Sequence, residues 1–202
     1  MNSEEIIATL KSLSNQKYRS NIIKLGIPEK SSLGVTTTKI RKLAKTINKS
    51  NELAYQLWSY NYHEAKLLAV LLFDNKQITL DEIKVLITNV TSWDLCDHLC
   101  KNLIIKIKGY DTLISEWVKS TQTYTKRAAF ILITSDIIHN KKIDDSTIDL
   151  YLELIKNNSH DSHPHIKKAV IWALKEIGKK DFDCQEKSLI TAYELGQNGD
   201  ET

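Results

Sequence analysis

The sequence predicts an all-α protein built from repeated pairs of helices. Only 6 of its 202 residues are Gly and 2 are Pro, which leaves few turn signals for a β protein. The chain instead divides into amphipathic segments that come in pairs, and the second segment of each pair is the longer and more apolar one. This pattern is typical of a helical-repeat solenoid, in which stacked pairs share one continuous core.

The segments can be followed along the chain from their capping residues. One of Thr36, Thr37 and Thr38 is expected to cap the first paired segment, and Thr79 with Glu82 forms a capping-box pattern before a later one. The expected helical segments are 39–50, 51–60, 63–73, 79–90, 91–100, 111–120, 124–138, 144–158 and 165–180. We therefore expect one domain over residues 1–202, with an N-terminal helical cap (1–35), paired-helix repeats (36–180) and a C-terminal helix and tail (181–202).

The second segments of three pairs resemble one another. "EAKLLAVL", "TKRAAFIL" and "IKKAVIWAL" each place basic residues just before a small and apolar run, so Lys66, Arg127 and Lys168 align. The copies recur irregularly, about 30 to 40 residues apart, which indicates a divergent repeat of the HEAT type. Equivalent helices line one concave face of such a curved superhelix. A basic residue repeated at one helical phase then predicts a basic stripe on that face.

The charge distribution matters more than the net charge of +3, which is too small to imply a nucleic-acid partner. Acidic residues cluster mostly at helix starts and chain ends, whereas basic residues recur in "KIRKLAK", "TKRAA" and "IKKAV". Any single run is explained by a solvated helix face, but repetition at one phase favours a phosphate-binding surface. The candidate nucleic-acid contacts are Arg41, Lys66, Lys126, Arg127, Lys167 and Lys168.

Trp93 and Asp97 are four residues apart and therefore share one face of a helix. They belong to a second helix of a pair, as do Arg127 and Trp172. Each has an ordinary structural explanation: Trp172 as core, Asp97 as a cap or lysine partner, and Arg127 as a surface charge. Their expected convergence on one basic concave surface instead indicates a functional site.

Cysteines and histidines occur close together at two places, and both residue types are common metal ligands. Cys96 and Cys100 flank His98, but a helix turns the imidazole away from both thiols, so we expect two buried small hydrophobic residues. The segment "SHDSHPH", with His160, His163 and His165, fits either a loop that contacts phosphate or a metal site, although its spacing matches no common zinc pattern.

The start of the chain is acidic, and no apolar run approaches the ~20 residues of a membrane span. With three cysteines and no disulfide framework, these features predict a cytoplasmic protein.

The sequence resembles the DNA alkylation repair family of HEAT-like glycosylases, the AlkD-like proteins. The matching stretches run from "LGIPEKSSLGVTTTKIRKLAK" and "HEAKLLAVLLFD" through "SWDLCDHLCKNL" and "KRAAFILI" to "KKAVIWALKEIGKK", over roughly residues 22 to 180. The "SWDLCD" and "KKAVxWAL" blocks are the most specific. The resemblance places Trp93, Asp97, Arg127 and Trp172 on the active-site positions of the family. It also implies a further helix beyond "AYELGQNGDET" in relatives.

The resemblance implies hydrolysis of the N-glycosidic bond of purines alkylated at N3 or N7. Such a base is cationic and leaves readily, so the enzyme needs a carboxylate near the sugar, for which Asp97 is the candidate. Trp93 and Trp172 would hold the cationic nucleotide against their rings, and Arg127 would bind the neighbouring phosphate. The family is expected to grip the DNA backbone without a tight pocket for a flipped base.

The expected partner is double-stranded DNA that contains alkylated bases, bound by a monomer without a cofactor, a metal or a membrane. Two other functions fit the same sequence. A non-catalytic binder of damaged or structured DNA would need the basic stripe but not Asp97. A protein-interaction scaffold would need an apolar or mixed concave face in place of the basic residues.

Overall fold

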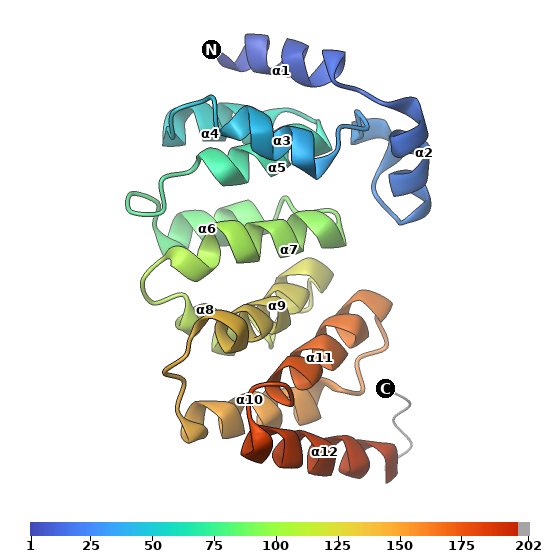
Figure 1. Cartoon of the computed structure of the whole chain (residues 1–202), viewed down its shortest axis with the longest axis vertical. Coiled ribbons are helices and arrows are strands. Elements are labelled where there is room, and N and C mark those ends of the chain that lie inside the picture. The colour runs from blue at the N-terminus through green and yellow to red at the C-terminus, as the bar shows by residue number, and fades with distance from the viewer. Residues whose placement is uncertain (198–202) are drawn as a thin grey trace. The chain divides into compact units, whose positions relative to one another are not determined.

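The computed structural model describes residues 1–197, and every regular element in that range is a helix (Figure 1). The α-helices are α1 (Ser3–Ser12), α2 (Gln16–Lys24), α3 (Thr37–Ala44), α4 (Asn51–Ser59), α5 (His63–Leu72), α6 (Leu80–Ile87), α7 (Trp93–Asn102), α8 (Asp111–Trp117), α9 (Thr123–His139), α10 (Asp145–Asn158), α11 (Pro164–Ile177) and α12 (Phe182–Gln197). Two short 3-10 helices are η1 (Glu29–Ser31) and η2 (Ile104–Lys106). The all-α prediction is confirmed, and the predicted tail at 198–202 lies outside the described residues.

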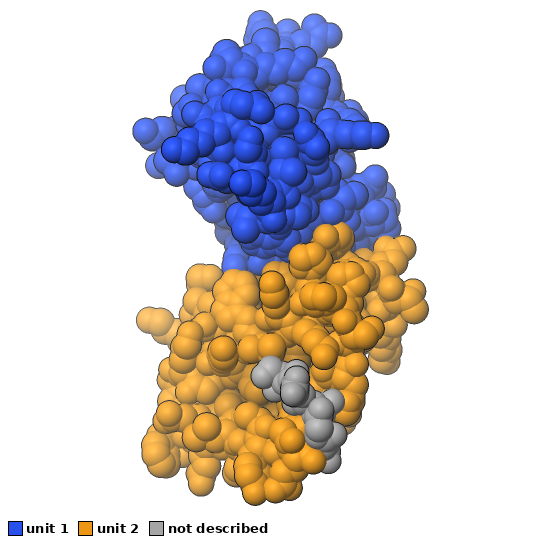
Figure 2. Space-filling model, turned by 90° about the vertical axis from the view of Figure 1, so that its right-hand side faces the viewer, with its two compact units in different colours: residues 1–108 blue, residues 109–202 orange. Residues whose placement is uncertain are grey.

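The chain forms two compact units, residues 1–108 and residues 109–202 (Figure 2). The first unit holds α1 to α7 with both 3-10 helices, and the second holds α8 to α12. The single domain and its internal boundaries stay a prediction. No helix within residues 1–197 is both long and apolar enough to cross a membrane.

The helix starts follow from local side-chain caps. The Thr36 side chain accepts a hydrogen bond from the backbone N–H of Lys39 and so begins α3. Thr79 and Glu82 form a reciprocal capping box at the start of α6, as their spacing predicts. The Asp144 side chain likewise accepts from the backbone N–H of Thr147 at the start of α10. Three of the paired helices thus begin where polar side chains satisfy their first N–H groups.

In the first unit, α5 is the central helix and packs against α3, α4 and α7 (Figure 1). Its apolar residues are buried on nearly every side, which explains why the sequence there is apolar beyond one face. Cys96 and Cys100 of α7 are fully buried cysteines outside any disulfide. The prediction that they act as small hydrophobic residues is confirmed.

In the second unit, α9 packs against α8 and α11, while α10 contacts α11 and α12. Residues 127–137 of α9 are all buried, so this helix has no single apolar face. The Asp136 carboxylate in its last turn accepts hydrogen bonds from the hydroxyls of Tyr110 and Tyr151, which ties the start of α8 and the middle of α10 to α9. Burial raises the pKa of both phenols, and the Asp136 carboxylate raises it further. Both tyrosines therefore remain protonated donors at neutral pH.

Candidate functional site

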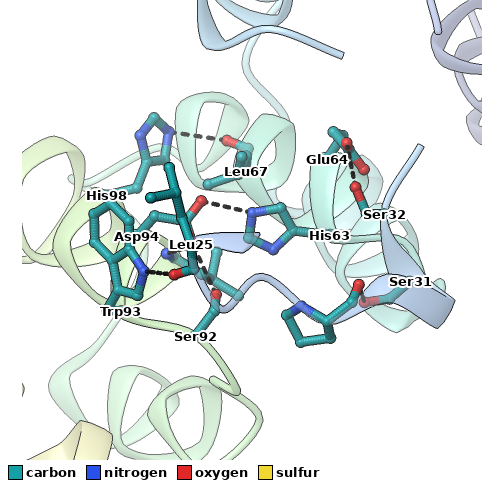
Figure 3. A network of polar contacts seen from close by, with 12 residues as sticks. Leu25, Ser31, Ser32, His63, Glu64, Leu67, Ser92, Trp93, Asp94 and His98 are labelled. Atoms are coloured by element: carbon teal, nitrogen blue, oxygen red, sulfur yellow. Dashed lines mark hydrogen bonds and ion pairs between the residues drawn. The ribbon is translucent and has the colours of Figure 1, made fainter. Parts of the chain in front are cut away.

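The face of α7 that carries Trp93 and Asp97 is only half-buried. Trp93 is the first residue of the helix and Asp97 the fifth, so the two side chains lie one turn apart on one face. The Trp93 indole N–H donates to the carbonyl oxygen of Leu25 at 2.9 Å, which connects this face to the loop after α2 (Figure 3). The expectation that neither residue belongs to the core is confirmed.

A buried polar network lies behind this face (Figure 3). The His63 Nε2–H donates to Asp94 Oδ2 at 2.7 Å, and the Ser92 hydroxyl donates to Asp94 Oδ1 at 2.8 Å. Burial alone would raise the pKa of Asp94, but these hydrogen bonds and the His63 charge lower it below its usual value. Asp94 is thus an ionised carboxylate that joins the start of α5 to the start of α7.

His98 lies about 100° around α7 from Asp97 and is buried. Its Nε2–H donates to the Leu67 carbonyl oxygen at 3.1 Å, and its Nδ1 accepts from the Asn102 amide at 3.2 Å. Burial lowers the pKa of His98 to about 4, and the nearby Arg41 charge adds to that effect. His98 is therefore neutral at physiological pH and fixes α7 against α5.

Glu64 anchors the loop that leads into α3. Its carboxylate is buried and accepts from the backbone N–H groups of Leu33, Gly34 and Val35 at 2.9, 2.7 and 3.2 Å. Gly34 has φ of +80°, and a Cβ there would lie 2.6 Å from the Arg19 Cβ, so glycine is required at this turn. The loop between α2 and α3 is therefore held by Glu64 at one end and by the Trp93 indole at the other.

The two basic candidates of the first unit differ in exposure. Lys66 is half-buried over the Trp58 ring, 5.5 Å from its centroid, and its Nζ donates to the Asn89 carbonyl oxygen. Burial lowers the pKa of Lys66. Arg41 is exposed, and its guanidinium donates to Asn102 Oδ1 at 3.1 Å. Arg41 is thus the more accessible of the two cations.

Arg127 is buried, contrary to the expectation of a surface residue that binds phosphate. Only 5% of it is exposed, and its Nη1 donates to the carbonyl oxygen of His165 at the start of α11. This burial follows from its place on α9, which packs against α8 and α11. Trp172 on α11 is half-buried, and its indole N–H donates to Glu176 Oε1 at 3.1 Å, so it is not plain core.

The lysines of the second unit occupy different environments. Lys126 Nζ lies 2.7 Å from Asp161 Oδ2 in an ion pair, Lys167 is half-buried and Lys168 is exposed. Counted from the first helical residue, Lys66 matches Lys126 and Lys167 at the fourth position. The predicted equivalence of Lys66 with Arg127 and Lys168 is therefore wrong by one residue, which is about 100° around a helix.

Trp93 and Asp97 belong to the first unit and Arg127 and Trp172 to the second. One site that joins all four stays a prediction, as does the concave basic stripe. Within residues 1–197, no group of three or more His, Cys, Asp and Glu side chains is placed to hold a metal ion. His163 and His165 lie with their ring centroids 5.5 Å apart at the start of α11.

Three polar residues that shape these regions are not among those predicted from the sequence. Glu64 and Asp94 are the second residues of α5 and α7, and Asp161 lies in the loop before α11. Acidic residues at helix starts are common enough that the sequence offered only the helix-dipole explanation. What distinguishes Glu64 is its burial, and what distinguishes Asp94 and Asp161 is a partner on another helix.

Comparisons with known proteins identify the fold and the family of this chain. A profile described as DNA alkylation repair enzyme matches residues 6–195. A solved structure from a protein family related to the HEAT-like repeat DNA glycosylases, with affinity for branched DNA structures, superposes with a TM-score of 0.87. That protein is 20% identical, and the match covers 96% of this chain and 83% of the other. A comparison with curated proteins gave no significant match. The helical chain has the HEAT-like repeat fold and belongs to the DNA alkylation repair enzyme family.

Proposed function

We propose that this protein is a DNA glycosylase that releases cationic N3- or N7-alkylated purines from duplex DNA. The observation that carries the proposal is the half-buried face of α7, where an indole and a carboxylate lie one turn apart. Membership in a family of DNA alkylation repair enzymes supplies the substrate class.

The two side chains suit complementary parts of that reaction. An alkylated purine is positively charged, and an indole face attracts a cation by ~0.5–2 kcal/mol. As the glycosidic bond breaks, positive charge develops on the sugar, and the Asp97 carboxylate would stabilise it and orient the attacking water. The water's oxygen bonds to the anomeric carbon and one of its protons passes to the Asp97 carboxylate, while the electrons of the broken glycosidic bond leave with the base and neutralise its charge. No cofactor is required for this step.

The direct test is base release. Purified protein incubated with duplex DNA that contains N7-methylguanine is expected to liberate the free base and leave an abasic site, measured by chromatography of the released base. The same duplex without the lesion is the control. Binding to both duplexes without any released base would contradict the proposed activity.

A second candidate function is binding of branched or otherwise structured DNA without catalysis. It is favoured by the burial of Arg127, which is held by the His165 carbonyl oxygen where the glycosylase proposal needs a phosphate contact. The structurally similar protein comes from a family with affinity for branched DNA. Tighter binding to a four-way junction than to duplex, together with absent base release, would support this candidate.

DNA binding by α11 predicts a specific dependence on salt. Each phosphate that a lysine neutralises contributes about −0.9 to the slope of log K against log salt. The double variant Lys167→Ala and Lys168→Ala is therefore expected to have a shallower slope, by up to about two such contributions. The slope is measured by titrating duplex DNA at several salt concentrations from low to moderate. Lys141→Ala with Lys142→Ala, two exposed lysines beyond the end of α9, is the matched control. Equal slopes for both double variants would exclude α11 from the interface.

Trp172→Ala separates a functional indole from a structural one. Since Trp172 is half-buried, its removal is expected to leave the fold intact while reducing base release more than affinity for undamaged DNA. Trp117→Ala is the structural comparison, because Trp117 is 3% exposed and its loss should cost ~3–5 kcal/mol of unfolding free energy. Thermal unfolding and single-turnover base release measure the two effects. A Trp172→Ala protein as destabilised as Trp117→Ala would make Trp172 a core residue.

A further inference from the structure

The loop between α10 and α11 places a carboxylate against the start of α11. Asp161 Oδ2 lies 2.7 Å from Lys126 Nζ, and Asp161 Oδ1 accepts from the backbone N–H of His163 at 2.9 Å. The side chains of Lys126 and Asp161 are 18% and 15% exposed, so the pair is largely removed from water. Lys126, a candidate DNA contact, is therefore neutralised by the protein's own anion.

The surroundings of Asp161 are those of an anion-binding site. His163 is the N-cap of α11 and Pro164 its first residue, so the positive end of a 14-residue helix lies beside the carboxylate. Burial alone would raise the pKa of Asp161, but Lys126 and the His163 N–H lower it below its usual value, and the His163 charge contributes. The His165 ring lies beside both the His163 ring and the Tyr124 ring. An ionised carboxylate is bound where an ammonium, a backbone N–H and a helix terminus meet.

A DNA phosphodiester matches the same donors. It carries one negative charge and two free oxygens, as the carboxylate does, and could accept from both Lys126 Nζ and the His163 N–H. Asp161 lies in a loop rather than in α10 or α11, so it can leave without breaking a helical hydrogen bond. Exposed Lys168 lies on the next turn of α11, so the site adjoins another candidate DNA contact.

We propose that Asp161 occupies a phosphodiester-binding site formed by Lys126 and the first turn of α11, and that a DNA backbone phosphate displaces it on binding. This inference rests on the DNA binding in the proposed function, but not on base excision. Asp161 then acts as an internal competitor: it keeps the lysine paired in the free protein and weakens the binding of any DNA that does not place a phosphate at this point.

The test is a set of charge-neutral substitutions in the full chain. Asp161→Asn removes the competing charge and frees Lys126, so duplex affinity at low salt should rise on the order of tenfold. The log–log salt slope should become steeper by about 0.9, the contribution of one additional phosphate contact. In a Lys126→Ala background, Asp161→Asn should give no such gain. Asp149→Asn is the matched control, since Asp149 pairs with Lys187 at 2.6 Å elsewhere in the same unit.

Each outcome decides between explanations. If the wild type binds DNA and Asp161→Asn binds it with the same affinity and the same salt slope, the inference is overturned and the proposed function stands. An equal gain in affinity in Asp149→Asn, or a gain that persists in the Lys126→Ala background, would show that the effect comes from net charge alone. Either result would also overturn the inference. Absence of DNA binding by both wild type and Asp161→Asn would overturn the proposed function together with the inference. Loss of base release alone affects only the proposed function.

A measurement on the wild-type protein avoids dependence on the folding of a variant. Duplex DNA added to ¹⁵N-labelled protein should shift the His163 amide resonance, because its acceptor changes from carboxylate to phosphate. A parallel titration with inorganic phosphate, at the same concentration of negative charge, tests whether a small free anion shifts the same resonance. A shift with inorganic phosphate but none with duplex, or no shift with either, would overturn the DNA site.

Discussion

Asp97→Asn should abolish release of 7-methylguanine from duplex DNA while leaving DNA binding unchanged or slightly tighter. The amide has the size of the carboxylate but no charge, so the developing positive charge on the sugar loses its counter-charge and the water loses its acceptor. A rate loss of about 10²–10⁴-fold is expected for such a group. Binding is preserved because a carboxylate that faces phosphates repels them. Single-turnover base release beside a binding titration measures both quantities.

The matched control for this substitution is Asp81→Asn, which removes an exposed carboxylate from the first turn of α6 in the same unit. It should retain full base release. Equal release by wild type and Asp97→Asn would remove the catalytic role from Asp97. Weaker binding with unchanged chemistry would instead make Asp97 a structural residue of α7.

The helices could be predicted because their signals are local. Thr36 lies three residues before the N–H that it caps, and Thr79 and Glu82 cap each other across the same distance. The burial of Cys96 and Cys100 followed from the helical periodicity of α7 alone. Trp93 and Asp97 share a half-buried face for the same reason. Each of these inferences needed only the geometry of one helix.

The contacts that modify the candidate site could not be predicted, because they join distant parts of the chain. Lys126 and Asp161 are 35 residues apart, and nothing in either segment indicates that the loop before α11 reaches α9. Arg127 looked like a surface cation because arginine side chains usually face water. The residues that follow it on α9 are buried on all sides of the helix, so the sequence does not indicate the direction of its burial. The one-residue error in aligning Lys66 arose because "EAKLL" and "TKRAA" match by composition but begin at different helical positions.

Glu64 illustrates the same limit in the first unit. A carboxylate at the second position of a helix is expected to face water and complement the helix dipole. Glu64 is instead 1% exposed, because the loop before α3 turns its backbone N–H groups towards it. That backbone path depends on the positive φ of Gly34 and cannot be read from hydrophobic periodicity. The loop it anchors also meets the Trp93 indole through Leu25, so Glu64 contributes to the position of the candidate site.

Glu64→Gln should therefore destabilise the protein by about 2–3 kcal/mol, although it preserves the size of the side chain. One carboxylate oxygen becomes an NH₂ group, which cannot accept, so at least one buried backbone N–H at Leu33 to Val35 loses its partner, and the remaining bonds lose their charge assistance. Urea unfolding measures the loss, with Glu52→Gln on the exposed first turn of α4 as the control, expected to change stability by less than about 0.5 kcal/mol. Amide hydrogen exchange at Gly34 and Val35 should accelerate in Glu64→Gln, because the loop opens without global unfolding. Unchanged unfolding and exchange would show that the loop is held by its apolar contacts rather than by the carboxylate.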